Sequence, residues 1–158
     1  MKLSFRPLHP LFAAEVSPID LRLAADSGTL EQIRAGMNEY AGLVFRDQAF
    51  ADSEQLDFAQ RFDGQLHSKT GIAALYNNRF GNEALTDISN VDEAGEILST
   101  NDRRRAYALG TRLWHAGATL QGPPGGYSVL PARIVPPVSA DTEFADTRAG
   151  YDALAPEM

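Results

Sequence analysis

The chain has 158 residues, of which 44% are hydrophobic, as expected for one domain with its own core. Its net charge of −7 argues against a nucleic-acid surface, and the absence of cysteine excludes disulfides, zinc–thiolate sites and thiol nucleophiles. We find no signal peptide and no apolar run near the ~20 residues of a membrane span, so we expect a cytoplasmic single domain over 1–158 without membrane or nucleic-acid partners.

Two helices are predicted in the first part of the chain, separated by a short buried strand at 43–45. The first begins at Thr29, because residues 29–32 form a T-x-x-Q capping pattern, and Gly42 is placed to end it. The second begins near Asp52, whose carboxylate can cap it. The apolar positions at helical spacing are Leu30, Ile33, Met37, Leu56, Phe58, Ala59 and Phe62.

The middle of the chain loses this helical periodicity. Residues 65–82 are predicted to form a long loop, and loops of that length are often functional. Residues 86–91 alternate as in a strand, and 92–95 resemble a hairpin turn. The basic run Arg103–Arg105 is interpreted as a solvated turn or helix face, with contact to an anion as the alternative.

Strands are predicted to dominate the remaining part of the chain. Residues 113–115 and 127–135 have strand character and are separated by a Gly/Pro turn at 122–126. Asp146 can cap a last helix that runs through Leu154. Helices followed by strands and a final helix indicate a mixed α+β fold.

Three segments carry a family resemblance: residues 7–22, the Leu113–Gly117 segment around His115, and the Asp141–Asp146 segment. Together they resemble the TauD/TfdA-like dioxygenases, which use Fe(II) and 2-oxoglutarate. The resemblance implies the N-terminal portion of a double-stranded β-helix, or jelly roll, with flanking helices. Because the chain ends near the middle of the family's usual length, we expect a single domain truncated before its C-terminal half.

In this family a His-x-Asp motif on a strand supplies two of the three Fe(II) ligands. Residues i and i+2 of a strand project to the same side, so both side chains converge on one ion. His115 matches the histidine and is the expected metal ligand, whereas Gly117 replaces the expected Asp. Related halogenases use a small residue there and let chloride take the vacated position, so Gly117 is either a functional substitution or a loss.

The resemblance also assigns residues to the cosubstrate and the substrate. The Thr142 hydroxyl would bind a carboxylate of 2-oxoglutarate; the alternative is a β-branched residue placed by strand propensity. His67 and Lys69 could hold a small anionic substrate, although an isolated lysine is usually solvated. Asn90 would line the pocket or satisfy backbone groups. We expect His115 and Thr142 to face a common cavity.

The implied activity is hydroxylation of a small carboxylate such as an aryloxyacetate, with release of succinate and CO2. The sequence lacks counterparts of the family's distal histidine and of its arginine for 2-oxoglutarate, so we expect impaired activity. One alternative is a non-catalytic remnant or interaction module, in which open strand edges would favour a homo-oligomer. Another is one half of a split enzyme whose C-terminal half is a separate polypeptide.

Overall fold

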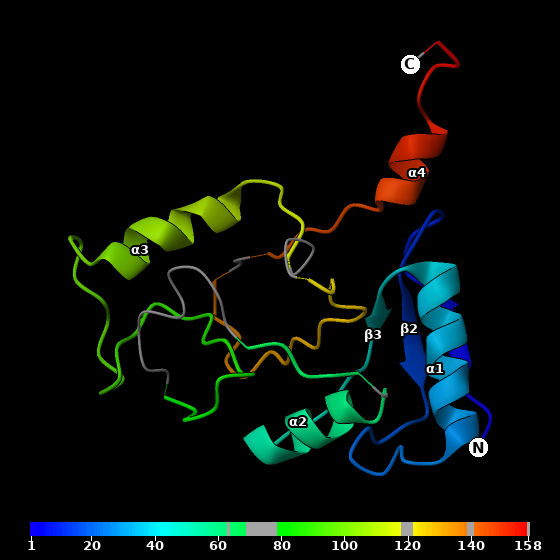
Figure 1. Cartoon of the computed structure of the whole chain (residues 1–158), viewed down its shortest axis with the longest axis horizontal. Coiled ribbons are helices and arrows are strands. Elements are labelled where there is room, and N and C mark those ends of the chain that lie inside the picture. Colours follow the sequence, from blue (N-terminus) through cyan, green and yellow to red (C-terminus); the bar gives the residue numbers. More distant parts are fainter. Residues whose placement is uncertain (63, 69–78, 118–121, 139–140, 158) are drawn as a thin grey trace. The chain divides into compact units, whose positions relative to one another are not determined.

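The computed structural model of the chain is shown in Figure 1. The residues it describes are 1–62, 64–68, 79–117, 122–138 and 141–157. The chain divides into two compact units: one comprises Met1–Glu54 with Leu130–Met158, and the other comprises Gln55–Val129. No helix in the described ranges is both long enough and apolar enough to cross a membrane.

The first unit is built on a three-stranded sheet in the order β1-β2-β3. β1 (Ser4–Pro7) and β2 (Ala14–Ser17) are antiparallel, with Phe5 opposite Val16. β3 (Leu43–Val44) runs parallel to β2 and confirms the strand predicted at 43–45. The sequence analysis missed β1 and β2, because strands of four residues are too short to display a clear alternation.

Helix α1 (Ser27–Tyr40) begins earlier than predicted. Its N-cap is Asp26, whose Oδ1 accepts the backbone N–H of Thr29 at 2.8 Å. The prediction that Thr29 caps the helix was therefore wrong: aspartate is at least as good a cap as threonine, and the buried Thr29 lies within the first turn. The helix ends at Tyr40. Its C-cap is Ala41, which has a left-handed φ of 59°, and Gly42, the predicted stop, is the residue after the cap.

The apolar face of α1 packs on the sheet, beside which it runs in Figure 1. Leu30 and Ile33 are buried as predicted, whereas Met37 is half-buried. The ring of Phe5 covers Gly36 and stacks on Tyr40 at 5.9 Å between centroids. The core of this unit includes Leu3, Ala14, Val16, Leu21, Ala24, Leu30 and Ile33.

Helix α2 (Asp52–Gln60) confirms the second predicted helix. Asp52 is its first residue, and Asp52 Oδ1 forms an ion pair of 2.7 Å with Arg133. At the same end Glu54 Oε2 accepts the N–H of Ala51 at 2.8 Å, which is half of a capping box. Phe58 is buried on this helix.

The second unit contains the predicted turn and a helix over the basic run. Val91 pairs with Ile97 in one antiparallel bridge, and the N–H of Asp92 donates to the Glu96 carbonyl at 2.8 Å, so the hairpin turn at 92–95 is confirmed. Helix α3 (Arg103–Ala108), continued by the 3-10 turn η2 (Leu109–Arg112), confirms the helix-face interpretation of the arginines.

Three predicted strands are not formed. Residues 113–115 and 127–135 contain no strand, and 86–91 contributes only the bridge at Val91. Leu113 is extended, with φ −99° and ψ 149°, but extension becomes a strand only when a neighbouring segment completes the hydrogen bonds. Within the described part of the chain these segments have no such neighbour.

The last predicted helix is present and shorter than expected. α4 (Thr147–Asp152) is capped by Asp146 as predicted and ends before Leu154. In the predicted loop at 65–82, the described residues at 65–68 and 79–82 contain neither helix nor strand. The rest of that loop lies outside the described residues.

Candidate functional site

His115 lies in an exposed segment directly after η2. Its Nδ1 is 3.1 Å from the carbonyl oxygen of Leu113. A carbonyl can only accept, so this contact is a hydrogen bond when Nδ1 carries the proton, and the lone pair of Nε2 is then free to bind a metal. A hydrogen bond of this kind also fixes the ring orientation, as is common for metal-binding histidines.

Gly117 contributes no ligand beside His115. A Cβ added at Gly117 would meet nothing within 4 Å, so the backbone leaves room for a side chain here. Among the described residues no group of three His, Cys, Asp or Glu side chains is placed to hold a metal. His115 is therefore a single donor, and these residues do not by themselves fit the three-ligand iron site of the family.

Thr142 is exposed in the segment that leads into α4. It belongs to the first unit, whereas His115 belongs to the second. The expectation that both face one cavity stays a prediction, as does the contact of Thr142 with 2-oxoglutarate.

The three expected substrate residues differ in their surroundings. His67 is half-buried, and Asn90 is exposed, with its backbone carbonyl accepting the N–H of Leu98 at 2.9 Å. Lys69 lies outside the described residues. The bond at Asn90 uses its main chain, so the Asn90 side chain is not needed for it and the predicted substrate contact stays open.

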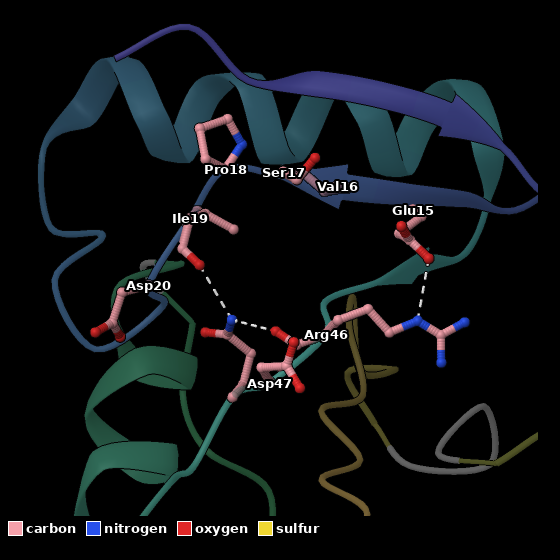
Figure 2. Close-up of a pocket in the computed structure, with 9 residues that line it drawn as sticks. Glu15, Val16, Ser17, Pro18, Ile19, Asp20, Arg46 and Asp47 are labelled. Atoms are coloured by element: carbon pink, nitrogen blue, oxygen red, sulfur yellow. Dashed lines mark hydrogen bonds and ion pairs between the residues drawn. The ribbon is translucent and has the colours of Figure 1, made fainter.

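A cavity of about 310 Å³ lies beside β2 in the first unit, and Figure 2 shows its lining. Gln48 closes one side: its Nε2 donates to the Ile19 carbonyl at 3.1 Å, and its Oε1 accepts the N–H of Leu21 at 2.8 Å. The residues that line the cavity are Glu15, Val16, Ser17, Pro18, Ile19, Asp20, Arg46, Asp47 and Gln48. Neither His115 nor Thr142 is among them.

Two arginines hold the carboxylate of Glu15 at the edge of this cavity. Arg46 Nε and Arg6 Nη2 each lie 3.0 Å from Glu15 Oε2 (Figure 2 shows the Arg46 pair). The hydrogen bond from Arg46, followed by that from Arg6, lowers the pKa of Glu15 below its ordinary value. The sequence analysis did not single out these residues, because they meet only through the pairing of β2 with its neighbours.

The chain belongs to the family described as "Taurine catabolism dioxygenase TauD, TfdA family", which it matches over residues 4–158. Fe(II) and 2-oxoglutarate, the expected metal and cosubstrate, are those that membership of this family implies.

Two curated relatives and one solved structure illustrate the match. The chain is 40% identical to an alpha-ketoglutarate-dependent 2,4-dichlorophenoxyacetate dioxygenase of Cupriavidus pinatubonensis, covering 100% of this chain and 55% of the relative. It is 35% identical to a (S)-phenoxypropionate/alpha-ketoglutarate-dioxygenase of Sphingobium herbicidovorans, with coverage of 96% and 48%. A crystal structure of AAD-2 with Mn(II) and N-oxalylglycine superposes with a TM-score of 0.83 and 36% identity, over 99% of this chain and 51% of that one.

The chain thus spans about half the length of these relatives, and it corresponds to their N-terminal half. The family prediction made from His115, Thr142 and the residue 7–22 segment is confirmed.

Proposed function

We propose that this chain provides the N-terminal half of an Fe(II)- and 2-oxoglutarate-dependent dioxygenase, with the fold of a partial jelly roll. The observation that carries the proposal is its superposition on half of AAD-2, which was solved with Mn(II) and N-oxalylglycine, at 36% identity. The proposed reaction is hydroxylation of a small carboxylate such as an aryloxyacetate, coupled to conversion of 2-oxoglutarate into succinate and CO2.

Within this proposal His115 binds the metal through Nε2, and its Nδ1–H contact with Leu113 holds the ring in place. Gly117 itself supplies no side-chain ligand at the neighbouring position. The described residues supply only one metal ligand. The role that we derive for the chain is therefore limited to binding and orienting the metal and the cosubstrate.

Thr142 is proposed to bind the cosubstrate. A hydroxyl can donate to a carboxylate oxygen, and a hydrogen bond to a charged partner is stronger than one between neutral groups. Thr142 is exposed, so its hydroxyl is accessible to a ligand. The proposal is supported by the resemblance of residues 141–146 to a family segment, and these residues lie within the range 4–158 that the family model matches.

The proposed substrates are small organic anions. The two relatives described above are named for 2,4-dichlorophenoxyacetate and (S)-phenoxypropionate, both carboxylates. On a chain with a net charge of −7, binding an anion requires local positive charge. Lys69, together with His67 when it is protonated, would supply that charge, and Asn90 would supply a neutral hydrogen-bonding group.

A chimaera tests the cosubstrate assignment. This chain replaces the matching half of the Cupriavidus pinatubonensis enzyme, to which it is 40% identical. Calorimetry with Mn(II) then measures the dissociation constant of 2-oxoglutarate. Thr142→Val should weaken binding about tenfold, the effect of losing one hydrogen bond to a charged group. The control Thr147→Val, in α4, should bind as the unmodified chimaera does. Equal affinity of both variants would contradict the assignment.

A further inference from the structure

Three Asp-x-Arg sequences occur in the chain, and each forms the same local structure. The aspartate Oδ1 accepts the backbone N–H of the arginine two residues later, at 2.8–3.0 Å. The same carboxylate pairs with the guanidinium of that arginine. The three pairs are Asp20 with Arg22, Asp102 with Arg104, and Asp146 with Arg148. All three sites share this local bond pattern.

The third pair differs because Arg148 also reaches a distant helix end. Its Nη1 donates to the carbonyl of Asn38 at 2.6 Å, and its Nη2 donates to the carbonyl of Glu39 at 3.4 Å. These residues lie in the last turn of α1, which contains no basic residue of its own. Carbonyls in the last turn of a helix have no partner within the helix and carry partial negative charge.

The neighbouring carbonyls of this helix end are bound by the backbone. Ala41 N–H donates to the Met37 carbonyl at 2.9 Å, and Ala13 N–H donates to the Tyr40 carbonyl at 2.7 Å. Arg148 thus supplies the partner for the two carbonyls between them, and it brings the positive charge that favours this end of the helix.

Asp146 fixes the direction of the Arg148 side chain. Arg148 Nε lies 3.1 Å from Asp146 Oδ1, and Nη2 lies 3.1 Å from Oδ2. The Asp146 side chain is only 7% exposed, so this fork is held in a restricted position. The ion pair lowers the pKa of Asp146, which keeps the carboxylate charged at neutral pH.

We propose that Arg148, oriented by Asp146, is a positioning residue that anchors the Thr142 segment to the end of α1. Thr142 precedes Asp146 by four positions (146 − 142), so the chain holds it within about 14 Å of the anchor. The functional meaning of this anchor rests on the proposed role of Thr142 in binding 2-oxoglutarate. The position of the segment does not depend on that role.

Spin labels on the full chain test the anchor. The native chain has no cysteine, so Ala35→Cys on α1 and Phe144→Cys beside Thr142 introduce two unique labelling positions. Pulsed electron–electron double resonance should give one narrow distribution of the distance between the two labels. Arg148→Gln should abolish the narrow peak, because glutamine lacks the charge and the fork. Arg148→Lys should restore it in part, because the ammonium keeps the charge but not the bidentate geometry.

Arg104→Gln is the matched control, since it removes the same local Asp-x-Arg pair in the other unit. It should leave the narrow peak unchanged. An unchanged peak in Arg148→Gln, or an equal loss in Arg104→Gln, would overturn the anchor. Thermal melts identify a variant that fails to fold. If Arg148→Gln fails to fold, the distance distribution of Arg148→Lys decides. A distribution of intermediate width supports the anchor, and one as narrow as in the native chain overturns it. The affinity of Thr142→Val for 2-oxoglutarate tests the proposed function separately.

Discussion

Gly36 of α1 and Phe5 of β1 are in such close contact that a methyl group on Gly36 would collide with the Phe5 ring. Glycine inside a helix costs about 0.5–1 kcal/mol relative to alanine, so its presence needs a compensating contact. Here the missing side chain lets the helix approach the sheet and lets Phe5 stack on Tyr40. The packing of the first unit depends on this small residue.

Replacing Gly36 with alanine should therefore destabilise the chain, although alanine is the better helix former. We expect a loss of about 1–3 kcal/mol in the free energy of unfolding, the usual effect of overpacking. Urea denaturation measures it. Gly28→Ala in the same helix is the control, because a Cβ there makes only an ordinary contact of 3.5 Å with Asp26. A Gly36→Ala variant as stable as the native chain would contradict the packing described.

Replacing Ala41 with glycine at the C-terminal end of α1 should stabilise the chain. Ala41 adopts a φ of 59°, which costs an L-residue about 1–2 kcal/mol and costs glycine little. Ala41→Gly should raise the midpoint of urea denaturation, with a gain below about 1 kcal/mol after the extra freedom of the unfolded chain is counted. Ala35→Gly, in the middle of the same helix, should lower it. A lower midpoint for Ala41→Gly would contradict the left-handed assignment.

The N-terminal cap of α1 predicts a dependence of stability on pH. Hydrogen bonds from Thr29 lower the pKa of Asp26 in the folded chain. A carboxyl with a lowered folded pKa stabilises the fold above its unfolded pKa, and this contribution is lost as the pH falls through that value toward the folded pKa. Stability should thus decline in acid, below about pH 4.

The variant Asp26→Asn measures how much of the stability lost in acid is due to the cap. Its thermal midpoint should change less than that of the native chain when the pH falls from neutral into the acid range. Glu31→Gln, which removes an exposed carboxylate of the same helix, serves as the control. If the thermal midpoints of Asp26→Asn and Glu31→Gln fall equally as the pH is lowered, the cap is not the source of the pH dependence.

Local sequence signals predicted local structure well. The spacing of Leu30 and Ile33, the turn at Asp92 and the cap at Asp146 each depend on residues a few positions away, and the structure contains all three. The predictions of strands at 113–115 and 127–135 were wrong, because a strand forms only beside a neighbouring segment, which can lie anywhere in the chain.

The candidate site shows the same division between local and distant information. His115 and Thr142 were singled out through segments that resemble those of the family. The comparison confirms the family, and the roles of the two residues stay predictions. The contact between Arg148 and the Asn38 carbonyl spans 110 positions, and no local pattern announces it. The Glu15 pair with Arg46 depends likewise on the parallel pairing of β2 with β3.

We propose that His115 occupies the metal-binding position of a 2-oxoglutarate-dependent dioxygenase, and that Gly117 supplies no side-chain ligand two residues further on. The most direct test is succinate formation from 2-oxoglutarate in air, with Fe(II) and an aryloxyacetate, by the chimaera that carries this chain. A Cβ at position 117 has open space, so Gly117→Asp can be accommodated and places a carboxylate two residues after His115.

We predict multiple-turnover succinate from the Gly117→Asp chimaera, less from the chimaera with the native glycine, and none when His115→Ala is added to Gly117→Asp. Circular dichroism melts of each variant provide the control for folding. Equal succinate formation with and without His115 in folded protein would contradict the metal-binding role of His115. A folded Gly117→Asp chimaera that forms no succinate would contradict it as well.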